Sequence, residues 1–332
     1  MGFDSNTAGH IDRRAIPPAA TEALWHAADG AAIRRIDWPG HPGELDGDGP
    51  RGSLLFLPGR GDFYEKYLES LDYWHGQGWR VTALDWRGQA GSGRLTANPN
   101  TGHVSDFSVW VDDLAGFWSD WVKSTPGPHV IVGHSMGGHL VLRSVAEKRI
   151  NPVAVVLSAP MLGFLTPGPN RVLHKVAEAM CRFGDPERTA WKISEKPGTT
   201  LAARNTLLTH DEARYADEAH WKAARPFLGL GPGSWRWVER AYASMLVLDA
   251  PGMLERVEQP VLLLSARYDG LVSSRAIEKA ARRLPRAQLT VWGREARHEL
   301  LREVDAVRDK VIRTIDDFLD RLAPALGESE IA

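Results

Sequence analysis

Residues 129–137 read HVIVGHSMG, and this stretch decides the fold. An apolar run, residues 129–132, predicts a buried strand, and a helical pattern opens at Met136. The turn between them, Gly133 to Gly137, matches G-x-S-x-G, the strand–turn–helix arrangement of a nucleophile elbow. Ser135 is therefore expected at the carboxyl edge of a sheet, beside the positive end of a helix. A phosphate-binding turn is the alternative, but no accompanying phosphate-binding motif is present.

Short β-rich runs alternate with helical stretches on both sides of this elbow. The alternation predicts a mostly parallel sheet, eight-stranded once an N-terminal hairpin is included, with helices on both faces. The hairpin turns at Asp29-Gly30. Helices are expected over 64–77, 107–123, 136–148, 273–284 and 306–321, and the clearest strands over 31–38, 53–57, 80–84, 129–132, 153–157, 261–265 and 288–292.

The composition supports a folded protein and argues against several functional classes. Hydrophobic residues make up 43% of the 332 residues, which is enough for a sizeable core. Forty Lys and Arg against 42 Asp and Glu give a formal charge of −2, so a nucleic-acid partner is not expected. Cys181 is the sole cysteine, which rules out an intrachain disulfide. No cofactor and no metal are expected.

The alternation divides the chain into a core and an insertion. Residues 21–160 and 246–325 are predicted to form the α/β core, and residues 161–245 a helical cap without strands. Residues 1–20 are expected to be a poorly ordered leader. No signal peptide or membrane-spanning stretch is recognised, which predicts a cytoplasmic protein, with peripheral contact to the inner membrane left open.

A serine nucleophile needs a general base and a group to orient that base. In this architecture the acid and then the histidine follow the serine along the chain. Asp269 follows the strand over 261–265, and His298 follows the last strand, so both should reach the edge that carries Ser135. Asp249 is a rival acid. His134 and His139 lie beside the elbow and are interpreted as structural.

Acyl transfer also needs two backbone donors for the developing oxyanion. The N–H of Met136, directly after the serine, is expected to be one of them. The loop after the strand over 53–57 reads PGRGD, and we assign the second donor to the N–H of Arg60. An ordinary β-turn is the alternative for that loop.

Together these residues resemble the monoacylglycerol lipase and bacterial lysophospholipase group of serine α/β-hydrolases. The matching stretches, in family order, are PGRGDFYEKY, LDWRGQAGSGR, GHVSDFSVWVDDL, GHSMGG, SARYDGLV and ARHELLREVD. The resemblance implies an α/β-hydrolase fold, a carboxylic ester hydrolase with Ser135, Asp269 and His298 as its triad, and a helical cap over the site. The chain departs from the family at Pro58, where a histidine is usual. This departure leaves the backbone donor at Arg60 in place.

The expected cap is rich in aromatic side chains. These could bind an acyl chain, which suggests a small-molecule acyl ester such as a monoacylglycerol or a lysophospholipid. Packing of the cap onto the core is the competing interpretation. The candidate substrate contacts are His103, Trp191, Trp221, Trp235 and Trp237.

Other functions fit the same pattern. An aminopeptidase or amidase, a C–C hydrolase or haloperoxidase, and a non-catalytic binding module all stay open, and the sequence does not set the oligomeric state. Most of the thirteen tryptophans precede the elbow and are interpreted as packing for the sheet.

Overall fold

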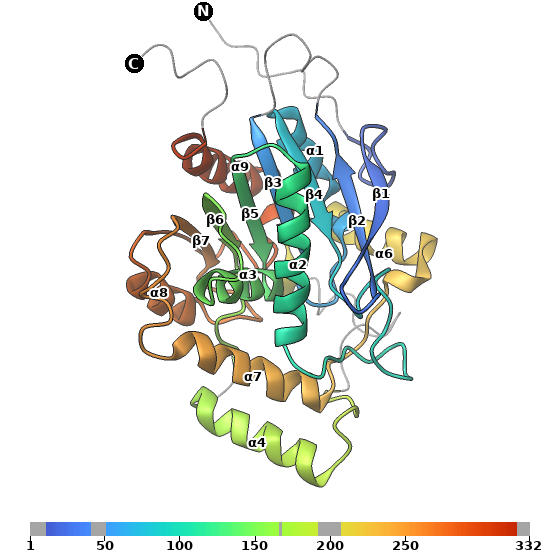
Figure 1. The fold of residues 1–332 in the computed structure, drawn as a ribbon, viewed down its shortest axis with the longest axis vertical. Helices are drawn as coiled ribbons and strands as arrows, with labels where there is room; N and C mark the ends of the chain where they lie inside the picture. The colour runs from blue at the N-terminus through green and yellow to red at the C-terminus, as the bar shows by residue number, and fades with distance from the viewer. Residues whose placement is uncertain (1–10, 41–50, 166–167, 192–206, 324–332) are drawn as a thin grey trace, which may run out of the picture.

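The computed structural model describes residues 11–40, 51–165, 168–191 and 207–323. Its centre is one eight-stranded sheet with the strand order β1-β2-β4-β3-β5-β6-β7-β8 (Figure 1). Strand β2 pairs antiparallel with β1 and with β4, and all the other strand pairs are parallel. This confirms the predicted mostly parallel sheet. The strands are β1 Thr21–His26, β2 Ala32–Trp38, β3 Gly52–Leu57, β4 Trp79–Leu84, β5 His129–His134, β6 Ala154–Ser158, β7 Val261–Ala266 and β8 Ala287–Trp292.

Helices cover both faces of the sheet, because successive strand side chains point to opposite sides. Along β3, Leu54 and Phe56 belong to one apolar cluster, and Leu55 and Leu57 to another. One face packs against α1 and α9, and the other against α2, α3 and α8. The helices are α1 Leu68–Gly76, α2 Ser108–Ser124, α3 Met136–Ala146, α4 Asn170–Phe183, α6 Glu212–Ala224, α7 Trp235–Asp249, α8 Ser274–Arg283 and α9 Asp305–Asp320.

The predicted helix over 64–77 differs in its first turn. Residues Tyr64–Tyr67 form a 3₁₀ turn, and α1 begins only at Leu68. The backbone N–H of Tyr64 donates to Asp85 Oδ1 at 3.3 Å, so this turn is fixed by a side chain on the loop after β4. Because the two residues are 21 positions apart in the chain, the local periodicity of residues 64–77 does not predict this contact.

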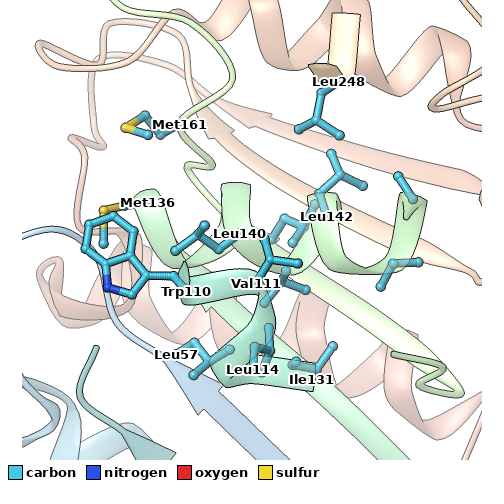
Figure 2. Packing of buried hydrophobic residues seen from close by; sticks show 14 of the residues in the cluster. Leu57, Trp110, Val111, Leu114, Ile131, Met136, Leu140, Leu142, Met161 and Leu248 are labelled. Atoms are coloured by element: carbon cyan, nitrogen blue, oxygen red, sulfur yellow. The ribbon is translucent and has the colours of Figure 1, made fainter. Parts of the chain in front are cut away.

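Most tryptophans pack the sheet and its helices, as predicted. Trp110 illustrates this packing, since it lies with Leu57 and Met136 between β3, α2 and α3 (Figure 2). The other buried tryptophans of the core are Trp38, Trp74, Trp79, Trp86, Trp118, Trp121 and Trp292.

The segment 161–245 contributes α4, α6 and most of α7. Its described residues contain helices and isolated bridges but no strand, and α7 runs on to Asp249. Trp237 and Met245 of α7 join the apolar cluster of the core. Helix α4 packs along α7 on the side away from the sheet (Figure 1).

Part of the expected leader lies outside the described residues. Residues 11–20 are described, and Arg13 Nε and Arg14 Nε each lie 2.7 Å from a carboxylate oxygen of Asp217 on α6.

Candidate active site

The turn between β5 and α3 holds Ser135 in a conformation that side chains rarely adopt, with φ of 51° and ψ of −116°. The Ser135 N–H donates to Ser158 O at 2.9 Å. Close packing requires glycine here, because a Cβ at Gly137 would lie 2.4 Å from the carbonyl oxygens of Leu57 and Pro58. The strained turn therefore presents the hydroxyl at the carboxyl edge of the sheet.

A chain of two hydrogen bonds joins Ser135, His298 and Asp269. His298 Nε2 lies 3.0 Å from Ser135 Oγ, and His298 Nδ1 lies 2.7 Å from Asp269 Oδ2. The other carboxylate oxygen of Asp269 accepts the backbone N–H groups of Leu271 and Val272, at 2.7 and 3.0 Å. The histidine and the aspartate are both buried, whereas the serine is partly exposed. This geometry suits proton transfer from the hydroxyl to the imidazole.

Electrostatics adjust the pKa of both partners of the serine. Burial disfavours the charged imidazole of His298, but Asp269, and then Glu299 and Asp62, outweigh burial and raise the pKa of His298. Burial also acts to raise the pKa of Asp269, yet the imidazole and the two backbone donors keep that pKa below its ordinary value. The pair therefore favours an ionised aspartate that stabilises a protonated histidine.

The loop after β3 lies directly against the elbow. A Cβ at Gly59 would lie 3.1 Å from Ser135 Cβ, so this loop approaches the serine as closely as a glycine permits. The loop is fixed by three side chains: Asp62 Oδ2 accepts from Gly59 N at 3.2 Å, Gln89 Oε1 from Gly61 N at 2.6 Å, and Trp86 Nε1 donates to Pro58 O at 2.8 Å. Arg60 follows Gly59 directly in this loop, and Met136 is the first residue of α3.

A buried charged cluster behind the site was missed by the sequence analysis. Lys66 Nζ lies 2.5 Å from Asp62 Oδ1, 2.6 Å from Glu299 Oε1 and 3.2 Å from Glu218 Oε2. Arg302 binds the other oxygen of Glu299. The available signals were the i, i+4 spacing of Asp62 and Lys66 after the glycine loop and the acid directly after His298.

Three members of this region could in principle hold a metal ion. Within the described ranges, ligand atoms of Asp62, His134 and Glu299 lie within 4.8 Å of one another. The ammonium group of Lys66 already contacts two of these three side chains, and so it supplies the positive charge that an ion would bring.

The rival residues have other partners. Asp249 binds Lys279 at the surface. His139 Nε2 lies 2.6 Å from Ser244 Oγ, and burial followed by Arg143 lowers the pKa of His139 to about 3. The pKa of His134 falls to about 4 through burial and the nearby His298. Both histidines are buried and neutral, in keeping with a packing role.

Three of the candidate substrate contacts lie near the loop of Arg60. The Arg60 guanidinium is 5.0 Å from the ring centre of Trp191 and 5.1 Å from that of Trp237. His103 Nδ1 lies 2.9 Å from Ser234 Oγ, which in turn accepts from Trp237 N at 3.0 Å.

The two other candidates are placed differently. Trp221 lies buried on α6, where its indole donates to Arg13 O at 2.9 Å. Trp235 is half-buried at the start of α7, and its backbone N–H donates to Arg188 O.

Sequence comparison identifies relatives that extend over most of the chain. The family model described as serine aminopeptidase, S33, a hydrolase family, matches residues 48–305. Lysophospholipase L2 of Escherichia coli strain K12 is 33% identical over 282 residues, which cover 81% of this chain and 80% of that protein. Monoacylglycerol lipase of Mycolicibacterium smegmatis is 28% identical over 187 residues, or 55% of this chain and 63% of that protein.

Solved structures share the fold. A soluble variant of monoglyceride lipase from Saccharomyces cerevisiae, in complex with a substrate analog, has a TM-score of 0.72 at 20% identity and covers 95% of this chain and 98% of that one. A carboxyl esterase from Bacillus coagulans in complex with glycerol has a TM-score of 0.71 at 16% identity, with coverage of 92% and 100%. Among the helices described, none is long and apolar enough to span a bilayer.

Proposed function

The chain belongs to the serine aminopeptidase S33 family of α/β-hydrolases and is a carboxylic ester hydrolase, and on this premise we propose that Ser135 attacks lipid esters that carry a single acyl chain. The observation that carries the proposal is the hydrogen-bonded chain from Ser135 through His298 to Asp269. The relatives named as lysophospholipase and monoacylglycerol lipase support the lipid substrate class.

The reaction proceeds in two steps. His298 Nε2 accepts the proton of the Ser135 hydroxyl while Oγ bonds to the ester carbonyl carbon. The tetrahedral intermediate then expels the alcohol, which takes its proton from His298 and leaves an acyl-serine. Water repeats the sequence, with His298 as the base, and releases the fatty acid and the free serine. Asp269 orients the imidazole and stabilises its charged form throughout.

The oxyanion of each tetrahedral intermediate needs donors at fixed positions. The N–H groups of Met136 and Arg60 supply them in this proposal. Support comes from the closeness of Gly59 to Ser135 and from the three side chains that fix the loop around Arg60.

Residues 161–245 act as a cap, with His103, Trp191 and Trp237 beside the acyl chain. The positions of Trp191 and Trp237 around Arg60, and of His103 beside Ser234 at the start of α7, support this assignment. Trp221 and Trp235 are left out of this assignment, because the indole of Trp221 donates to Arg13 O and the backbone N–H of Trp235 donates to Arg188 O.

The outer face of α4 supports contact with a lipid surface. Val172, Val176 and Phe183 fall on one side of the helix and are 56%, 51% and 83% exposed. Along one side of this apolar stripe lie three exposed basic side chains, Arg171, Lys175 and Arg182. Such a face suits the boundary between the headgroups and the acyl chains of an anionic membrane, which would bring the site to its substrate.

Labelling with a fluorophosphonate probe tests the nucleophile. We expect the wild-type protein to be labelled at Ser135, and Ser135→Ala to lose both labelling and about 10⁴-fold in kcat on a p-nitrophenyl ester. Ser124→Ala, which changes an exposed serine at the end of α2, is the control and should behave as wild type. Wild-type turnover by Ser135→Ala would disprove the assignment.

A substrate panel tests the lipid class. Activity on p-nitrophenyl esters should hold or rise from butyrate to longer acyl chains, and lysophosphatidylcholine and monoacylglycerol should both be cleaved. A steady fall beyond butyrate would remove the lipid assignment. Faster turnover of aminoacyl anilides than of esters would favour an aminopeptidase instead.

A further inference from the structure

Lys66 is a fully buried cation that contacts three different parts of the site. Its side chain has no exposed surface, and its ammonium group contacts Asp62, Glu299 and Glu218. Asp62 belongs to the loop after β3, Glu299 follows His298 directly, and Glu218 lies on α6. Burying an ammonium group is costly unless carboxylates surround it, so this contact set is the condition under which Lys66 can occupy the interior.

Asp62 and Glu299 each connect Lys66 to a residue of the catalytic centre. Asp62 Oδ2 accepts the N–H of Gly59 at 3.2 Å and the hydroxyl of Tyr67 at 2.7 Å, and Gly59 lies against Ser135. Glu299 is the chain neighbour of His298. The Lys66 ammonium therefore bridges the loop that carries the proposed oxyanion donor and the loop that carries the base.

We infer that Lys66 is a positioning residue that holds these two loops in register and sets the charge beside His298. The inference deepens the proposed function and rests on it. Lys66 touches neither the serine nor the base, so it acts through Asp62 and Glu299.

The charges around the base predict the direction in which loss of Lys66 shifts the pKa of His298. Lys66, Arg302 and Lys222, which binds Glu218, carry three positive charges and balance the three negative charges of Asp62, Glu218 and Glu299. Removing Lys66 leaves one negative charge in excess, which favours the protonated imidazole. The titratable and charged groups around His298 are Asp269 from the loop after β7, His134 and Ser135 from the elbow, Glu299 from its own loop, and Asp62 and Lys66 from the loop and turn after β3.

His298 must be neutral to accept the serine proton, so a higher pKa moves the acid limb of kcat/KM to higher pH. We expect Lys66→Met to raise the midpoint of that limb by roughly half a pH unit or more. We also expect a loss of about 10- to 100-fold in kcat with little change in KM, because the loops lose their register in the transition state.

Glu299→Gln should shift the acid limb of kcat/KM in the opposite direction, and this test does not depend on the stability of the Lys66 variant. It removes one negative charge beside the base, so the acid limb should move to lower pH. Lys66→Arg keeps the charge and should restore most of kcat and the wild-type midpoint.

Arg51→Met is the matched control. Arg51 is also buried and charged, but it directly precedes β3 and therefore lies at the opposite end of that strand from the site. There it binds Asp320 and the carbonyl oxygen of Ala323. Its loss should lower stability and leave the pH profile unchanged. The inference is overturned if folded Lys66→Met keeps the wild-type kcat and midpoint, if Glu299→Gln moves the limb upward, or if Arg51→Met moves it equally. Failure of the proposed function looks different, since wild-type protein would then not be labelled at Ser135.

Discussion

Helices α6 and α4 belong to the same segment of the chain, yet α6 buries charged side chains and α4 exposes apolar ones. On α6, Arg214, Asp217 and Glu218 are charged and buried, and each has a partner outside the helix. On α4, Val172 and Phe183 are apolar and exposed. Helix α6 is thus tied to the core by ion pairs, whereas α4 packs along α7 (Figure 1). The apolar stripe of α4 is exposed.

The difference shows that one segment can serve two mechanical purposes. A buried ion pair is strongly destabilising to break, since it leaves an uncompensated charge behind. An exposed apolar side chain costs the fold little, but it gains free energy when a second apolar surface covers it. We therefore expect changes on α6 to act on folding and changes on α4 to act on encounters with lipid.

The largest expected effect is on α6. Arg214 binds Glu69 through two nitrogens at 2.6 and 2.7 Å, and it also binds Asp211, Asp305 and the carbonyl oxygen of Glu303. Arg214→Met should lower the free energy of unfolding by about 3–5 kcal/mol, because it leaves Glu69 without its principal partner in a poorly solvated position. Urea denaturation measures this change.

Arg171→Met on α4 is the control for Arg214→Met. Arg171 is exposed, so its loss should change the free energy of unfolding by less than about 0.5 kcal/mol. Equal effects of the two substitutions would show that the two helices are not attached differently.

The next effect is on α4. The triple variant Val172→Ser, Val176→Ser, Phe183→Ser should reduce turnover of lysophospholipid in anionic vesicles by about tenfold or more, since each substitution removes apolar area available to the bilayer. Turnover of p-nitrophenyl butyrate in solution should be unchanged. Val153→Ser, at an exposed valine outside the segment, is the control. A parallel loss on both substrates would place the stripe in folding or catalysis instead of lipid contact.

The sequence predicted the sheet well because its signals are local. Apolar runs such as residues 53–57 and the glycines around Ser135 carry their structural meaning within a few residues. The boundaries were less predictable where tertiary contacts decide them. The 3₁₀ turn at Tyr64–Tyr67 depends on Asp85, which lies 21 residues further along the chain.

The candidate site likewise contains residues that local sequence predicts and residues that only tertiary contacts explain. Ser135, Asp269 and His298 could be selected from their positions after strands, and the structure brings the three together. For Lys66 the sequence offers only the i, i+4 spacing to Asp62, which does not predict burial. A lysine in a polar stretch is ordinarily exposed, and its burial depends on carboxylates that lie up to 233 residues away in the chain.

The smallest expected effect is that of the α4 charges on the pH dependence of kcat/KM. The pKa of His298 is raised in the folded protein, and the base must be neutral to act, so the acid limb of kcat/KM on p-nitrophenyl butyrate should have its midpoint above pH 6.5. The groups that raise this pKa, Asp269, Glu299 and Asp62, lie on the core side, and Lys66 links two of them to α6. Removing two of the basic charges of α4 with Arg171→Ser and Arg182→Ser should therefore leave the midpoint within about 0.2 units of wild type, because exposed charges are screened by salt. A midpoint below 6.5 in the wild type would contradict the charge environment assigned to the base, and a shift caused by the α4 substitutions would show that the outer helix acts on the site electrostatically.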